Sequence, residues 1–161
     1  MTHISAAPSP LWLPYATYGL GADNTSFALT GLSQFQAVDG TFRGTKDATG
    51  AAYVYLQARQ AGGTWRELAQ SPVDMTGGQS WAVSFTIENF NNTDTGAAGL
   101  KRVSLAQVVN VAYGAAIKSL SDVTLIAAYA EVWDEIRVVH EFSTRKWDAS
   151  AGAQFTVRGR V

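Results

Sequence analysis

Large apolar residues that alternate with small or polar ones dominate this chain, and this pattern predicts β-strands. The alternation is clearest in residues 80–88, SWAVSFTIE, where every second position is large and apolar: Trp81, Val83, Phe85 and Ile87. Successive side chains of a strand point to opposite faces, so these four residues should lie on the buried face of a sheet. Residues 51–60 have the same period, with Val54, Leu56 and Ala58 on the expected inner face.

Further strands are predicted on both sides of these segments. Residues 26–44 contain short apolar runs, and the dipeptide Asp39-Gly40 between them predicts a tight hairpin turn. Residues 64–75 predict a return strand that is interrupted before Pro72. Three more strands are predicted toward the C-terminus, at residues 123–133, 136–142 and 153–161. About seven to nine short strands indicate an all-β fold, an antiparallel β-sandwich or barrel of the jelly-roll or immunoglobulin-like kind.

Residues 104–120 are ambiguous between helix and strand. Ser104 and Gln107 match a capping box, and apolar residues recur at helical spacing: Leu105, Val108, Val109, Ala112, Ala115, Ala116 and Leu120. Three valines in the segment favour a strand instead, and Gly114 disfavours a helix by about 1 kcal/mol. We expect one helix at about 104–120, with a strand as the alternative.

The first 24 residues are predicted to form an extended arm in front of a single β domain at residues 25–161. Pro8, Pro10 and Pro14 exclude a regular helix there. The arm is nonetheless strongly apolar, with Leu11, Trp12, Leu13, Tyr15 and Tyr18. Soluble monomers seldom expose such a strip. The arm should therefore pack either along its own domain as an edge strand or on a neighbouring subunit.

Composition limits the chemistry. With 161 residues the chain suits one domain, and only 16% of them are charged, against about 25% in typical domains. The net charge of −1 argues against nucleic acid or an anionic membrane as partners. The absence of cysteine excludes disulfides, thiolate metal sites and a thiol nucleophile. We predict no signal peptide, since no Lys or Arg precedes Arg43, and no membrane helix.

No catalytic motif stands out. The sequence lacks a serine-nucleophile motif and a phosphate-binding loop, and His140 should point into the core because Ile136 and Val138 share its face. The acidic residues Glu131, Asp134 and Glu135 could form a carboxylate pair for glycoside hydrolysis, although the solvated end of a hairpin explains them better. The sequence therefore predicts no catalytic residue, no cofactor and no metal ligand.

Binding functions are less restricted. Trp65, Trp133 and Trp147 lie near predicted turns or strand ends, so they could form an aromatic platform for sugars, or fill the core or an interface. The loop Asn91–Asp94 could hold calcium through oxygen atoms, but its single carboxylate makes it a weak site.

Taken together, the apolar proline-bearing arm, the cysteine-free β domain and the charge-poor surface resemble the structural proteins of tailed phages, namely capsid decoration or cement proteins and small tail components. The resemblance lies in organisation and involves no motif. It implies a non-enzymatic virion protein, assembled in the host cytoplasm, whose partners are further copies and other capsid or tail subunits. The predicted interface is Leu11, Trp12, Leu13, Tyr15 and Tyr18. The alternative function is a carbohydrate-binding module or lectin.

Overall fold

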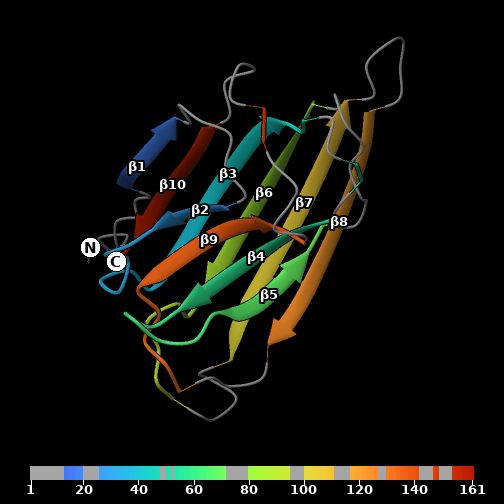
Figure 1. Ribbon diagram of the computed structural model, residues 1–161. Coiled ribbons are helices and arrows are strands. Elements are labelled where there is room, and N and C mark those ends of the chain that lie inside the picture. Colours follow the sequence, from blue (N-terminus) through green and yellow to red (C-terminus); the bar gives the residue numbers. More distant parts are fainter. Residues whose placement is uncertain are drawn as a thin grey trace, which may run out of the picture.

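The computed structural model describes residues 13–19, 26–47, 50–51, 53–71, 80–94, 100–110, 117–126, 130–141, 147–148 and 154–161. Within these residues the protein is all-β and contains no helix, which confirms the predicted fold class. In this described part of the chain, ten strands form two antiparallel sheets that stack as a β-sandwich (Figure 1).

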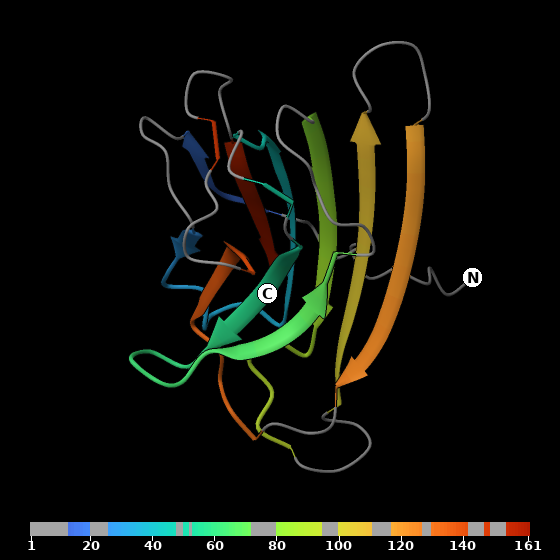
Figure 2. The ribbon, with the colours of Figure 1, turned by 45° about the vertical axis from the view of Figure 1, so that its right-hand side comes forward.

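The two sheets differ in size. The larger sheet has the order β1-β10-β3-β6-β7-β8, with β1 at Leu13–Gly19, β3 at Ala37–Thr45, β6 at Ser80–Glu88, β7 at Lys101–Asn110, β8 at Ile117–Ile126 and β10 at Gln154–Arg160. The smaller sheet has the order β2-β9-β4-β5, with β2 at Ser26–Leu29, β4 at Val54–Arg59, β5 at Arg66–Gln70 and β9 at Glu135–His140. Figure 2 shows the smaller sheet in front of one face of the larger sheet. The opposite face of the larger sheet is its outer face.

The core lies between the sheets and contains the residues that the alternation predicted. Val83, Phe85 and Ile87 of β6 are buried, while the side chain of Trp81 lies outside the described residues. Facing residues of β4 are buried as predicted: Val54, Leu56 and Ala58. Each large apolar side chain buried in this way contributes roughly 1.5–3 kcal/mol to folding.

The predicted helix at 104–120 is wrong. Lys101–Asn110 is strand β7 and Ile117–Ile126 is strand β8, and the two pair along their full length. The decisive pattern has a period of two, because Val103 and Leu105 are buried whereas Ser104 and Ala106 reach the outer face. The residues behind the helical spacing include Leu105, Val108 and Val109, and all three lie within β7. Strand β8 also ends at Ile126, so the strand predicted at 123–133 stops well before Trp133.

The predicted hairpin at Asp39-Gly40 is also wrong, because both residues lie within β3. Gly40 is needed there for packing, since a Cβ atom at this position would lie only 2.4 Å from the ring of Phe85 on the neighbouring strand. Asp39 points outward and pairs with Arg158 of β10. The chain instead changes sheet between β2 and β3, in residues 30–36.

Part of the predicted arm is an edge strand of the larger sheet. Leu13–Gly19 is extended, and its main chain pairs with β10 of the same chain. The main chain of residues 13–19 thus pairs within its own domain, while the side-chain contacts of Leu13, Tyr15 and Tyr18 lie outside what the structure describes. Leu11 and Trp12 lie outside the described residues. Contact of the arm with a neighbouring subunit stays a prediction.

Candidate functional site

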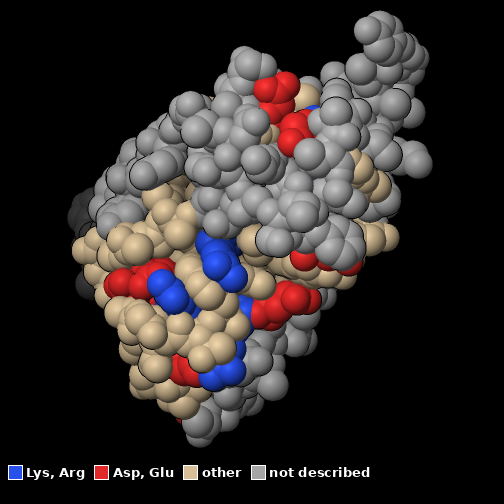
Figure 3. Space-filling view, viewed as in Figure 1, with Lys and Arg blue, Asp and Glu red and all other residues tan. Residues whose placement is uncertain are grey.

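A cluster of arginine and tryptophan side chains lies on the outer face of the smaller sheet. The guanidinium carbons of Arg59 and Arg137 lie over the ring of Trp65, at 4.3 and 4.2 Å from its centroid. Figure 3 shows basic and acidic side chains gathered on this face. We call Arg59, Trp65 and Arg137 the arginine–tryptophan cluster.

Strand register brings the cluster together. Strands β4 and β9 pair so that Arg59 is opposite Glu135, and Gln57 is opposite Arg137. Trp65 follows the turn at Gly62 and Gly63, just before β5. Such cross-strand pairs interact directly on one face of a sheet. The cluster therefore joins residues about eighty positions apart, which no local motif could reveal.

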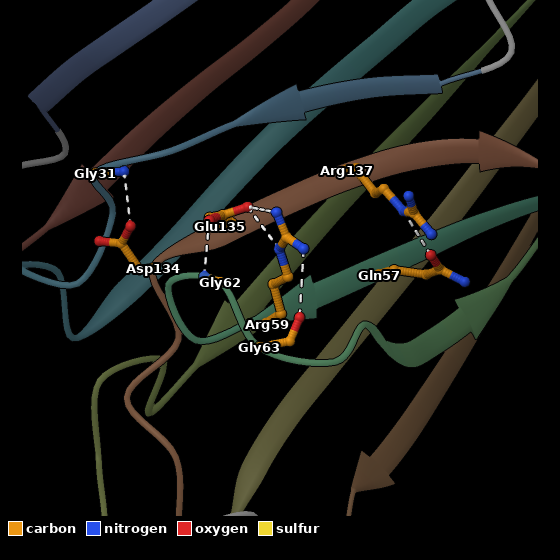
Figure 4. Close-up of polar contacts among 8 residues, drawn as sticks. All are labelled: Gly31, Gln57, Arg59, Gly62, Gly63, Asp134, Glu135 and Arg137. Atoms are coloured by element: carbon orange, nitrogen blue, oxygen red, sulfur yellow. Dashed lines mark hydrogen bonds and ion pairs between the residues drawn. The ribbon is translucent and has the colours of Figure 1, made fainter.

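Arg59 is neutralised by Glu135. Both its Nε and its Nη2 lie 2.6 Å from Glu135 Oε2, and its Nη1 donates to the carbonyl of Gly63 at 3.3 Å (Figure 4). The other oxygen of Glu135 accepts a hydrogen bond from the Gly62 amide at 3.3 Å. This ion pair fixes the β4–β5 turn and with it the position of Trp65.

Arg137 has a neutral partner instead. Its Nε donates to Gln57 Oε1 at 2.7 Å (Figure 4). Among the described residues, no carboxylate pairs with its guanidinium group. Burial lowers the pKa of Arg137, and the neighbouring charge of Arg59 lowers it further. The arginine stays protonated at neutral pH, so the cluster carries one uncompensated positive charge.

Glu131, Asp134 and Glu135, which were considered as a source of two catalytic carboxylates, each bind a different partner. Glu131 pairs with Arg66 at 2.7 Å, and the hydrogen bond from this arginine lowers the pKa of the carboxyl group. Asp134 is partly buried, which raises its pKa, but hydrogen bonds from Ser33 and from the Gly31 amide outweigh burial and lower it.

Glu135 is 8% exposed and bound to its arginine, so the expected solvated hairpin end is wrong as well. Each of the three carboxylates holds a different segment of the chain through an ion pair or hydrogen bonds.

The predicted orientation of His140 is confirmed, because it is 3% exposed and its ring lies 4.0 Å from that of Trp147. Trp133 and Trp147 are both fully buried, so neither can serve in an exposed aromatic platform. Trp65 is the remaining candidate of the three, and two arginines already lie over its ring. Of these three tryptophans, Trp65 alone is incompletely buried, and sugar binding stays a prediction.

Sequence reasoning missed Lys101, which organises the loop that had been considered for calcium. Its side chain is fully buried, and Nζ donates to the carbonyls of Asn89, Phe90 and Asn92 at 2.8, 2.9 and 3.0 Å. Nζ also lies 4.6 Å from the Trp133 ring centroid. Burial lowers the pKa of Lys101 to about 8, against the partly opposing charge of Glu131. The ammonium group thus supplies the positive charge that these three carbonyl oxygens surround.

The outer face of the larger sheet is the second candidate surface. A hollow of about 550 Å³ lies over β10, β3, β6 and β7. Register aligns small polar residues across these strands, and one row reads Thr156, Thr41, Ser84 and Ala106. The ion pair between Asp39 and Arg158 lies in the next row, with oxygen–nitrogen distances of 2.5 and 2.9 Å.

Within the described part of the chain, no group of three or more His, Cys, Asp or Glu side chains is placed to hold a metal ion. No helix in that part is long and apolar enough to cross a membrane. Comparison with known protein families, with curated proteins and with solved structures finds no match.

Proposed function

We propose that the protein is a non-enzymatic structural subunit that assembles with further copies and other subunits in a virus-like particle, such as the capsid or tail of a phage. The observation that carries the proposal is the position of β1 at an edge of the larger sheet. Within the described residues, β10 is the one strand that pairs with β1. A sheet edge of this kind offers main-chain groups to a further strand.

The segment that precedes β1 supports the same proposal. Residues 1–12 lead into the edge strand and include the apolar pair Leu11 and Trp12. Leu13, Tyr15 and Tyr18 follow within β1. An apolar segment that continues from a sheet edge is well placed to bury its side chains on a neighbouring copy, and burial of apolar area drives such association.

The outer face of the larger sheet offers a second contact for assembly. Its central rows consist largely of small hydroxyl and alanine side chains. Such side chains let a neighbouring subunit approach closely, and the low charge of the chain limits repulsion between crowded copies. The acidic groups considered for catalysis are instead employed in ion pairs and hydrogen bonds that hold the fold.

The test is removal of residues 1–12, which leaves β1 in place. Sedimentation velocity should show concentration-dependent association of the full chain and its loss in the truncated protein. Circular dichroism should give the same β spectrum for both, because every strand in the described residues is kept. As a matched variant, the full chain with Leu11→Ser and Trp12→Ser should behave like the truncated form. A truncated protein that associates as strongly as the full chain contradicts the role of the arm.

A further inference from the structure

We propose that Arg137 anchors a carboxylate-binding site on the outer face of the smaller sheet, and that the carboxylate is an acidic side chain of a second copy of this chain. The assignment of the partner rests on the proposed function, because it requires copies that assemble. The binding site itself stands on the geometry of the arginine–tryptophan cluster.

Arg137 has hydrogen-bond donors left for a ligand. A guanidinium group carries five N–H donors. The Nε donor is bound to Gln57, and among the described residues no acceptor is bound to the two Nη atoms. The paired Nη atoms form a planar fork that matches the two oxygens of a carboxylate. The free end of Arg137 is therefore suited to bidentate binding of an acidic side chain.

The local charge favours an anion. Glu135 balances Arg59, whereas the partner of Arg137 is a neutral amide. The residues directly opposite Arg137 on the neighbouring strands are Ala28 and Gln57, and neither is acidic. Arg137 is also partly buried, where attraction between opposite charges is stronger than in open water. A carboxylate that enters would complete the charge balance of the cluster.

The cluster is also held in place before a ligand arrives. Stacking on Trp65 and the hydrogen bond to Gln57 restrict the long side chain of Arg137. Binding then costs less side-chain entropy than it would for a freely rotating arginine. Arginine and tryptophan are also the residue types that dominate binding energy at interfaces. A second copy can supply the acid, because Glu67, for example, is exposed.

The site is tested with acetate as the carboxylate probe. The Nε–H signal of Arg137 is assigned in a nitrogen-15 NMR spectrum by its loss in Arg137→Gln, and the protein is titrated with sodium acetate at constant ionic strength against sodium chloride. We expect a saturable shift with acetate that chloride does not produce. A signal that responds identically to both salts overturns the site.

The partner is tested by sedimentation velocity of the intact chain. Arg137→Gln should weaken self-association by about tenfold or more, equivalent to about 1.4 kcal/mol. As a matched variant, Arg137→Lys keeps the positive charge but lacks the planar fork, and it should weaken association as well. Melting temperatures of both variants verify that they fold.

The outcomes separate the two proposals. If acetate binds but Arg137→Gln associates normally, the second copy is not the occupant. If the wild type stays monomeric at every concentration, the proposed function and the assigned partner both fail, while the acetate titration still decides the site.

Discussion

Replacement of Lys101 by methionine tests whether a buried ammonium group holds the loop between β6 and β7. In the wild type, Nζ binds the carbonyl oxygens of Asn89, Phe90 and Asn92. Methionine keeps most of the length and the apolar stem of the side chain but has no donor. The substitution therefore removes three charge-assisted hydrogen bonds and largely preserves the packing against Trp133.

The size of the effect depends on what the three carbonyls retain. The Asn89 carbonyl still accepts from the Asn92 amide at 3.1 Å, and the Phe90 carbonyl from the Trp133 amide at 3.3 Å. Hydrogen bonds to charged groups contribute roughly 1.5–3 kcal/mol each, but desolvation of the ammonium group offsets part of that sum. We expect a loss of about 2–4 kcal/mol in the free energy of unfolding. For a chain of this length, that lowers Tm by roughly 6–12 °C.

Urea unfolding followed by tryptophan fluorescence and circular dichroism measures the loss, and limited proteolysis reports on the loop. Arg102→Gln is the control, because it removes a neighbouring exposed cation of the same strand and should stay within about 0.5 kcal/mol of the wild type. If Lys101→Met is as stable as this control and its loop resists protease equally well, the ammonium group does not organise the loop.

Three further predictions concern stability. Burial lowers the pKa of Lys101 from 10.5 to about 8, so between these pH values the unfolded chain binds more protons, and the contribution of this group to stability rises by at most about 1.4 kcal/mol per pH unit. Urea unfolding from pH 7 to 10 should show the difference in free energy of unfolding between the wild type and Lys101→Met grow. A difference that stays constant would contradict this linkage. Gly40→Ala forces a Cβ atom into the Phe85 ring and should lower the free energy of unfolding by about 2–3 kcal/mol. Gly62→Ala meets no atom and should lower it by about 1 kcal/mol, because the backbone φ there is 69°. Equal melting temperatures for these two variants would refute the packing argument. Glu135→Gln removes the counter-charge of Arg59 and should lower the free energy of unfolding, measured by chemical denaturation, by about 1–2 kcal/mol. An unchanged denaturation midpoint would show that the ion pair does not contribute to stability.

Strands with one buried face could be predicted from the sequence, because their signal is local. In β6 large inward positions alternate with small or polar outward ones, and in β4 the inward positions are all apolar, as Phe85 and Leu56 illustrate. The segment 104–120 was misread because its apolar residues fit a helical spacing as well as a strand, and pairing of β7 with β6 and β8 selects the strand. The dipeptide at Gly40 was misread because its glycine serves a contact with another strand rather than a turn.

The candidate site could not be predicted, because its members meet only through strand register. Arg59 and Arg137 are unremarkable charges in the sequence, and nothing local places them on the same indole ring. Trp133 was expected near a strand end, and it does lie in the irregular segment before β9. Its side chain is fully buried there, which its position in the sequence does not indicate. Lys101 was missed for a related reason, because a lysine gives no sequence signal that it will be buried against main-chain oxygens.

The cation in the loop after β6 is covalently part of the chain, and this has a consequence for the conditions under which the loop keeps its shape. A bound metal ion exchanges with the medium, so its site empties when chelators or dilution remove the ion. Lys101 has no such dissociation equilibrium, and its ammonium group stays beside the Phe90 carbonyl at any calcium concentration. The arrangement of these carbonyls around Lys101 therefore does not depend on the metal-ion concentration. The ammonium group loses its charge only when the pH rises above its pKa of about 8.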